Sequence, residues 1–246
     1  MLATERRIYI MKLLNEKSIV SLKDIAAELG ASEITVRRDL EKLENVGKLK
    51  KIPGGAVLEG YLESAEMTMQ EKSAIHSESK RIIAKRASEM VKPGECVFLD
   101  GGTSIAPMME YLKGMEITIV TYNQLVLRKL VNPTATIHII GGQYLSHYGM
   151  NVGPEAQEQL QRYHFDAAFL GCSGVVIEQG MSFVTNMDSL LIKKIAMENS
   201  DRKYLLLDSS KYPKSSCFKF VPLDEFDLIF CNRGDEAISH ERMEFL

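Results

Sequence analysis

Residues 21–56 read SLKDIAAELGASEITVRRDLEKLENVGKLKKIPGGA, and this stretch predicts two short capped helices followed by a tight ribbon. Ser21 begins an S-x-x-D start signal for the first helix, and Gly30 follows where a helix ends in a left-handed residue. Ser32 can cap the second helix, which Gly47 closes. Two helices separated by a tight turn are typical of a helix-turn-helix module.

The second helix has one apolar stripe and a basic outer face. Apolar residues recur at the three-and-four spacing of a buried stripe, namely Val36, Leu40, Leu43 and Val46. With that stripe inward, Arg38 points outward and Ile34 is exposed near the N-terminal end, while the flanks hold Thr35, Arg37, Glu41 and Lys42. In a recognition helix, an isoleucine at this position can touch a thymine methyl, and an arginine can pair with guanine or phosphate.

This pattern resembles the DeoR family of bacterial transcriptional regulators. Its helix-turn-helix signature ends in Arg-Arg-Asp-Leu, here residues 37–40, and runs into a Gly-Gly-Ala wing, here residues 54–56. Ile52 and Pro53 stand where the family usually has a basic residue and histidine, so nearby lysines are expected to supply the charge of the wing. The predicted DNA-binding residues are Ser32, Ile34, Thr35, Arg37, Arg38, Lys42, Lys48, Lys50 and Lys51. The alternative is a solvated basic helix on a small α-domain.

Length and composition fit a soluble protein with two domains. The chain has 246 residues, of which 45% are hydrophobic and 26% charged. No apolar run reaches the length of a membrane span, and the N-terminal residues MLATERRIYI are charged where a signal peptide is apolar. We therefore expect a cytoplasmic protein without a membrane partner. Residues 1–58 hold 11 Lys plus Arg against 8 Asp plus Glu, net +3, and the remainder holds 19 against 25, net −6, which suits a basic reading head on an acidic body.

The cysteines give no sign of a metal site or a disulfide. They are widely spaced and include no C-x-x-C pair, which favours buried reduced thiols at Cys96, Cys172, Cys217 and Cys231. We expect no metal and no cofactor.

The remainder of the chain predicts a linker and a layered α/β domain. Residues 1–58 form the predicted winged helix-turn-helix domain, 59–79 the linker and 80–246 the effector-binding and oligomerisation domain. After a helix at RIIAKRASEM, short β-rich runs follow at CVFLD, ITIVT, TIHII, DAAFLG, KYLLLD and FDLIF. Helices are expected in the gaps at 104–113, 124–131, 154–162 and 187–199. This alternation indicates a Rossmann-like, mostly parallel sheet.

Polar residues follow these strands where they end, the edge at which open α/β sheets bind ligands. The first strand runs into Asp100, Gly101, Gly102, Thr103 and Ser104, where backbone N–H groups and two hydroxyls suit a phosphate at a helix start. Later strands end in Thr121-Tyr122-Asn123, Gly141-Gly142, Gly171-Cys172-Ser173-Gly174 and Asp208-Ser209-Ser210-Lys211.

The order of these loops is similar to the DeoR family's C-terminal sensor domain, which is related in fold to ribose-5-phosphate isomerases, glucosamine-6-phosphate deaminases and CoA-transferases. The resemblance implies a phosphorylated sugar effector, with residues 100–104 around the phosphate and Asp208 and Lys211 across the pocket. Lys193 matches a lysine common in the family, and Lys194 is the neighbouring candidate. The predicted effector-binding residues are Asp100, Gly101, Gly102, Thr103, Ser104, Thr121, Asn123, Gly171, Lys193, Asp208 and Lys211.

Three classes of function follow from this sequence. We expect a homo-oligomeric repressor of a carbohydrate operon that binds double-stranded operator DNA and is induced by a sugar phosphate. An isomerase or deaminase would need a carboxylate base, for which Asp100, Asp166 and Asp208 are the candidates. The third class is a DNA-anchored protein-interaction module without a small-molecule ligand. A reading head has no use in a free-standing enzyme, so no catalytic residue is predicted.

Overall fold

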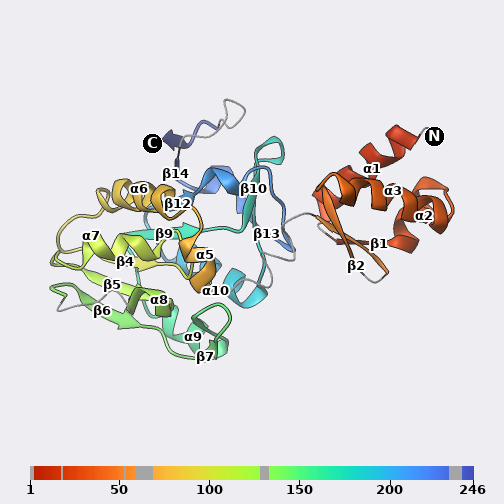
Figure 1. Cartoon of the computed structure of the whole chain (residues 1–246). Coiled ribbons are helices and arrows are strands. Elements are labelled where there is room, and N and C mark those ends of the chain that lie inside the picture. The colour runs from red at the N-terminus through yellow and green to blue at the C-terminus, as the bar shows by residue number, and fades with distance from the viewer. Residues whose placement is uncertain (1–2, 18, 53, 59–68, 128–132, 233–239) are drawn as a thin grey trace. The chain divides into compact units, whose positions relative to one another are not determined.

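The computed structural model describes residues 3–17, 19–52, 54–58, 69–127, 133–232 and 240–246. The chain divides into two compact units, the first comprising Met1–Glu66 with Ser215–Cys217 and the second Met67–Lys214 with Phe218–Leu246 (Figure 1). Within those described ranges, no helix has both the length and the apolar character needed to cross a membrane.

The first unit combines helices with an antiparallel sheet whose strand order is β1-β3-β2 in the described residues. In chain order its elements are α1 (Ala3–Lys17), β1 (Ile19–Ser21), α2 (Leu22–Leu29), α3 (Glu33–Asn45), β2 (Leu49–Ile52) and β3 (Gly55–Leu58). Ser21 caps α2 by accepting the N–H of Asp24 at 3.1 Å, and Ser32 caps α3 by accepting the N–H of Thr35 at 3.3 Å. Both predicted caps are therefore confirmed, and Gly30 ends α2 with a φ of 57°.

The apolar stripe of α3 faces the core of this unit, with one exception. Val36, Leu40 and Leu43 are buried there against side chains of α1 and α2. Val46 was predicted to join them, but its side chain is 64% exposed, so that prediction is wrong. The helix ends at Asn45 and Gly47 takes a φ of 67°, so Val46 no longer follows the helical period.

An ion pair between α1 and α3 was not predicted. Asp39 is 3% exposed, and its Oδ2 accepts a hydrogen bond from Arg6 Nε at 2.8 Å. Arg7 Nε lies 3.9 Å from Oδ1 of the same carboxylate. Asp39 thus fastens α3 to α1 from inside the Arg-Arg-Asp-Leu motif, whose two arginines are exposed.

The second unit is built on a parallel sheet with strand order β15-β14-β12-β9-β4-β5-β6 in its described residues (Figure 1). Its strands are β4 (Cys96–Leu99), β5 (Thr118–Thr121), β6 (Thr136–Ile139), β9 (Ala167–Gly171), β12 (Lys203–Leu207), β14 (Leu228–Cys231) and β15 (Met243–Phe245). The six predicted β-rich runs coincide with all of these strands except β15. Strand β15 has only three residues, with Glu244 in the middle, so it contains no run of apolar β-forming residues that would have predicted this edge strand.

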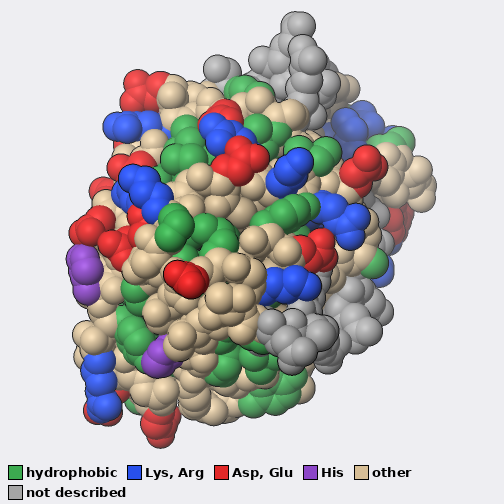
Figure 2. All heavy atoms as spheres, turned by 90° about the vertical axis from the view of Figure 1, so that its left-hand side faces the viewer, with side chains coloured by type: hydrophobic (Ala, Val, Ile, Leu, Met, Phe, Trp, Pro, Cys, Tyr) green, Lys and Arg blue, Asp and Glu red, His purple; other side chains and the backbone are tan. Residues whose placement is uncertain are grey.

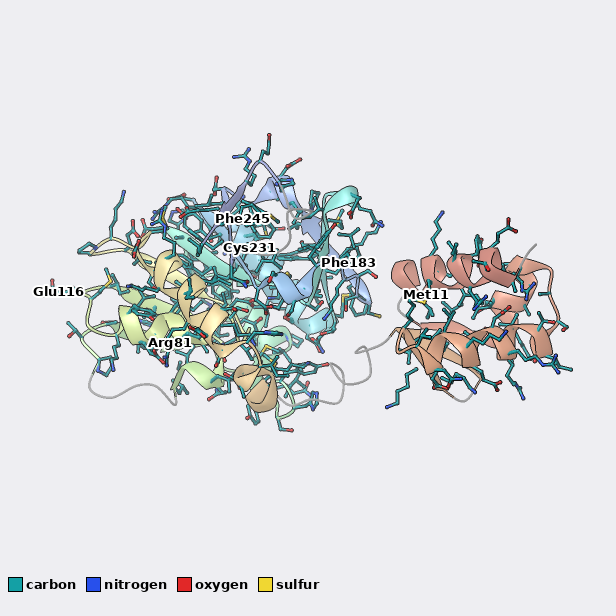
Figure 3. All side chains as sticks on the ribbon, turned by 45° about the horizontal axis from the view of Figure 1, so that its top comes forward. Met11, Arg81, Glu116, Phe183, Cys231 and Phe245 are labelled. Carbon is teal, nitrogen blue, oxygen red and sulfur yellow. The ribbon has the colours of Figure 1, made fainter. Side chains whose placement is uncertain are left out.

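Helices cover both faces of the sheet, as predicted for a layered fold. One apolar cluster joins the sheet to α6 (Ser77–Ser88), η1 (Ala106–Met108) and α7 (Met109–Leu112). The other joins it to α9 (Pro154–Leu160) and α10 (Met187–Glu198). Figure 3 shows the side chains, with Phe183 and Cys231 labelled within this unit.

Some predicted helices differ in length from the observed ones. The helix expected at 104–113 is the 3₁₀ turn η1 followed by the short α7. Helix α8 (Gln124–Leu127) begins where the helix at 124–131 was expected, and residues 128–131 lie outside the described part. Residues 59–68 of the predicted linker also lie outside it, and residues 69–79 contain α5 (Met69–Ala74) and the start of α6.

Further short strands lie outside the parallel sheet and were not predicted. Strands β10 (Gly174–Val176), β11 (Met181–Val184) and β13 (Phe218–Pro222) form an antiparallel sheet, and β7 (Gln143–Leu145) pairs with β8 (Met150–Val152). The remaining 3₁₀ turns are η2 (Ile177–Gln179), η3 (Ser209–Lys211) and η4 (Leu223–Glu225).

All four cysteines are free thiols, but they are not all buried. Cys172 and Cys231 are buried, Cys96 is partly buried and Cys217 is exposed. The prediction of burial is therefore wrong for Cys217. Among the residues that the structure describes, no group of His, Cys, Asp and Glu is suited to hold a metal ion.

Candidate functional site

The outer face of α3 presents an exposed surface with both apolar and basic character. The side chain of Ile34 is 69% exposed, and Arg37, Arg38 and Lys42 are also exposed. Thr35 is partly exposed, and its Oγ1 lies 2.9 Å from Ser32 Oγ at the start of the helix. These predicted DNA-binding residues therefore lie together at the beginning and along the outer face of one helix.

The wing consists of β2 and β3, and of the three lysines in and just before β2, two are exposed. Lys48 and Lys50 are exposed, but Lys51 turns back to α3, where its Nζ lies 3.2 Å from Glu41 Oε1 and 3.8 Å from Glu44 Oε2. Lys51 therefore helps to fix the wing to the helix. The side chain of Ile52 and all of Pro53 lie outside the described residues.

Gly55 allows β3 to lie against β1. A Cβ atom at this position would lie 2.3 Å from the backbone oxygen of Val20, which no side chain tolerates. The second glycine of the Gly-Gly-Ala motif is thus required by the packing of the wing.

In the second unit, the carboxyl ends of the parallel strands bring the predicted polar loops to one edge of the sheet. Asp100 follows β4, Thr121 ends β5, Gly171 ends β9 and Asp208 follows β12. On the face of this unit that Figure 2 shows, acidic and basic side chains are interspersed, as on a solvated surface. The concentration of buried polar groups is instead at the strand ends.

Asp100 is the centre of a buried hydrogen-bond network. Its carboxylate is inaccessible to solvent; Oδ1 accepts the Tyr122 hydroxyl at 2.6 Å, and Oδ2 accepts the Gly171 N–H at 2.8 Å and the ammonium of Lys193. Burial, and secondarily the charge of Asp100, raises the pKa of Tyr122 well above its ordinary value. Tyr122 is thus a neutral hydroxyl donor that was not among the predicted site residues.

Lys193, rather than Lys194, lies at this network. Its side chain is buried, its Nζ also donates to the Gly171 carbonyl at 2.9 Å, and the ammonium lies 5.9 Å from the centre of the Phe220 ring. Lys194, on the same helix, is exposed. Helix α10 thus contributes the Lys193 ammonium, whose positive charge balances the Asp100 carboxylate.

Thr121 and Asn123 hold the end of β4 and the start of the loop that follows it. Thr121 Oγ1 donates to the Leu99 carbonyl at 2.6 Å, and Asn123 Nδ2 donates to the Asp100 carbonyl at 3.0 Å. Both side chains are fully buried. Their hydrogen bonds give them a positioning role toward the loop.

The loop Gly101–Ser104 has donors that the fold leaves unused. Among the described residues, the N–H groups of Gly102, Thr103 and Ser104 have no hydrogen-bond partner. Lys211 Nζ lies 3.3 Å from Ser104 Oγ, which joins this loop to the one after β12. At Gly101 a Cβ atom would lie 2.1 Å from Met150 Sδ and 2.9 Å from Tyr122 Cζ, so a larger residue would displace these buried side chains.

Asp208 and Lys211 belong to a cluster that includes two lysines missed by the sequence analysis. Burial acts to raise the pKa of Asp208, but the charge of Lys211 and hydrogen bonds from Ser210 bring it below its ordinary value. Burial, and secondarily the positive charge of Lys211, lowers the pKa of both Lys72 and Lys80. Sequence offered one signal for Lys80, since it falls on the apolar stripe of α6 with Ile83, Ala84 and Ala87.

Both units match the domain models of one family. The DeoR-like helix-turn-helix domain matches residues 6–60, and the DeoR C terminal sensor domain matches residues 75–233. This chain belongs to the DeoR family. The assignment confirms the predicted architecture of a helix-turn-helix domain followed by a sensor domain, and the prediction of a DNA-binding transcriptional regulator rather than an enzyme.

Curated relatives match nearly the whole DeoR-family chain. The lactose phosphotransferase system repressor of Staphylococcus epidermidis is 32% identical over 230 residues, covering 92% of this chain and 90% of the relative. The putative aga operon transcriptional repressor of Escherichia coli O157:H7 is 32% identical over 243 residues, covering 97% and 89%. A solved ribose 5-phosphate isomerase A from Methanocaldococcus jannaschii overlaps 55% of this chain and 54% of its own at a TM-score of 0.40 and 18% identity, which supports no functional argument.

Proposed function

We propose that this DeoR-family protein represses a carbohydrate-use operon and is released from its operator when a phosphorylated sugar occupies the strand-end site of the second unit. The protein acts in the cytoplasm. It binds DNA as a homo-oligomer, because one winged helix alone offers too little contact surface for typical operator affinity. The two relatives named above are a repressor of a lactose phosphotransferase system and a putative repressor of an operon.

The DNA-reading role rests on the exposed face of α3. Ile34 lies where an apolar side chain can meet a thymine methyl, and Arg37 and Arg38 present guanidinium groups on the same exposed half of the helix. Lys48 and Lys50 on the wing supply charge for the phosphate backbone. Lys51, paired with Glu41, contributes less to DNA than the sequence alone suggested.

The effector role rests on the unused donors of the Gly101–Ser104 loop. Backbone N–H groups that the fold does not pair, next to the hydroxyls of Thr103 and Ser104, suit the oxygens of a phosphate. Lys211 adds a positive charge within 3.3 Å of the Ser104 hydroxyl. Beside this loop, Lys193 donates to Asp100 and to the Gly171 carbonyl, which leaves one ammonium hydrogen for the sugar part of the ligand.

The carboxylates proposed for catalysis are committed to the fold. Asp100 accepts three hydrogen bonds and is shielded from solvent, so it has little capacity to take a substrate proton. Asp166 precedes β9 at the opposite edge of the sheet, where it accepts the N–H of Cys96 at 2.8 Å. Asp208 accepts hydrogen bonds from both the N–H and the hydroxyl of Ser210. These contacts favour sensing over catalysis.

The decisive experiment measures operator affinity with and without ligand. Fluorescence anisotropy on the DNA upstream of the protein's own operon is recorded with glucose 6-phosphate, fructose 6-phosphate, fructose 1-phosphate and galactose 6-phosphate, each beside its unphosphorylated sugar. We expect one phosphorylated sugar to weaken operator binding by about 5- to 150-fold, the usual range of allosteric coupling. By linkage, operator DNA must weaken the binding of that sugar phosphate by the same factor.

Two substitutions localise the response. Lys211→Ala and Thr103→Ala should abolish the effect of the sugar phosphate, because they remove the ammonium and a hydroxyl from the proposed phosphate site. Lys214→Ala, an exposed lysine three residues beyond Lys211, serves as the charge-matched control and should respond as wild type does. A wild-type response in the Lys211 and Thr103 variants would place the effector elsewhere, and the interaction-module alternative predicts that no sugar phosphate acts on the wild type.

A further inference from the structure

Lys80 is a buried lysine on the apolar side of α6. It is 4% exposed and shares its side of the helix with Ile83, Ala84 and Ala87. An ammonium in such a position is unfavourable unless hydrogen bonds and opposite charge compensate for its lost hydration. The partners of Lys80 therefore indicate what this residue does.

The ammonium of Lys80 fastens the end of α5 to the start of α6. Its Nζ donates to the carbonyl of Lys72 at 2.5 Å and to the carbonyl of Ile75 at 2.7 Å. A lysine ammonium has three hydrogens, so one remains after these two bonds. Among the described residues, no further hydrogen-bond acceptor takes it.

The start of α6 lies at the same strand edge as Lys211. Asn232, which follows β14, donates to Ser79 Oγ at 3.4 Å and to Ser209 Oγ at 3.1 Å, so it bridges α6 to the loop after β12. Burial, and secondarily the charge of Lys211, lowers the pKa of Lys80 to about 8, against the opposing effect of Asp208.

The cluster has an excess of positive charge. Lys72, Lys80 and Lys211 repel one another electrostatically, and the carboxylate of Asp208 balances only part of that charge. An anion bound between these groups would remove the repulsion and supply the acceptor that the third hydrogen of Lys80 lacks. A phosphate held by Ser104 and Lys211 has the required charge and acceptors.

We propose that Lys80 is a further effector-binding residue that ties the anionic group of the ligand to α5. This inference rests on the proposed function. Helix α5 is the first described helix after residues 59–68, which join the two units in the chain. Ligand binding at Lys80 would therefore stabilise α5, which follows the residues that connect to the DNA-reading unit, through the carbonyls of Lys72 and Ile75.

The test uses the full-length protein in hydrogen–deuterium exchange and ligand titration. The probes are inorganic phosphate and the four sugar phosphates named above. In wild type, a bound sugar phosphate should slow exchange in peptides covering residues 69–76 by tenfold or more. Lys80→Met should bind the ligand at least tenfold more weakly and show fast exchange in α5 with or without it, whereas Lys85→Met, an exposed lysine on the same helix, should match wild type.

A second variant separates the charge of Lys80 from its role in folding. Lys80→Gln retains an amide donor for the carbonyls of α5 but no charge, so it should lose the same affinity while β4 and β9 exchange as slowly as in wild type. Wild-type ligand affinity in either Lys80 variant, or a wild-type slowing of α5 exchange in Lys80→Met, overturns the inference alone. Failure of every probe to bind wild type overturns the proposed function together with it.

Discussion

The Asp39→Asn substitution tests whether the acidic residue of the Arg-Arg-Asp-Leu motif supports the reading helix rather than DNA. Asp39 is almost fully buried and accepts a hydrogen bond from Arg6 at 2.8 Å, while Arg7 lies at 3.9 Å. A hydrogen bond to a charged group contributes about 1.5–3 kcal/mol and a neutral one about 0.5–1.5 kcal/mol. Asparagine keeps an oxygen acceptor but loses the charge, so we expect a loss of about 1–2 kcal/mol in the local stability of α3.

Glu41→Gln is the matched control, because it also removes one negative charge from α3. Its carboxylate is about half exposed and pairs with Lys51 at 3.2 Å, and such surface pairs contribute about 0.2–1 kcal/mol. Both variants change the electrostatic attraction to DNA in the same direction. A difference between them therefore reports the buried contact and not the net charge.

Native-state hydrogen exchange of the α3 amides is the suitable assay, since it reads local free energies without assuming that two units unfold together. The expected 1–2 kcal/mol corresponds to roughly 5- to 30-fold faster exchange in Asp39→Asn than in wild type. Equal exchange in the Asp39 and Glu41 variants would refute the assignment of Asp39 to the α1–α3 contact.

Three further outcomes follow from the structure. Arg38→Ala should weaken operator binding by about 1–3 kcal/mol with an unchanged circular dichroism spectrum, and normal operator affinity in the folded variant would contradict the DNA contact of Arg38. Val36→Asp should instead unfold the first unit, because it places a charge in the core of that unit. Effector affinity should fall as pH rises through about 8, because Lys80, which faces Lys72, Lys211 and Asp208, then loses its proton. The free energy of unfolding should rise between about pH 8 and 10.5, the ordinary lysine pKa, because the unfolded chain binds more protons than the folded one in this range. Titration calorimetry checks the first effect and denaturation at several pH values checks the second. Sedimentation should show at least a dimer, both free and on DNA, and a strict monomer in both states contradicts the proposed assembly.

Local sequence patterns were sufficient wherever a structure depends on neighbouring residues. The caps at Ser21 and Ser32 act over three residues, and the β-rich runs such as VFL before Asp100 fill a sheet that is buried on both faces. The strands β10, β11 and β13 escaped prediction because they pair antiparallel with one another, outside the alternation of strands and helices that indicated the parallel sheet. Val46 failed because a helical period cannot show on which residue the helix stops.

The functional residues show even more clearly that contacts between residues distant in sequence could not be predicted. The polar loops were evident because each follows a predicted strand, and the parallel sheet brings them together. Asp39 gave no such sign, since its partner Arg6 lies 33 residues away. Lys193 could not be separated from Lys194 until the rotation of α10 was known. Lys80 was overlooked because a charged residue is usually read as solvated, even on an apolar stripe.

The alternation of roles along α3 has an evolutionary consequence. Residues that reach outward, such as Ile34 and Arg38, interleave with residues that hold the helix in place, such as Val36 and Asp39. If α3 reads DNA as proposed, substitutions at the outward positions change operator preference with little effect on folding, because surface changes usually alter stability by less than about 0.5 kcal/mol. Duplicated copies of such a gene can therefore diverge toward different operators by drift at a few positions, while the inward positions keep every intermediate folded.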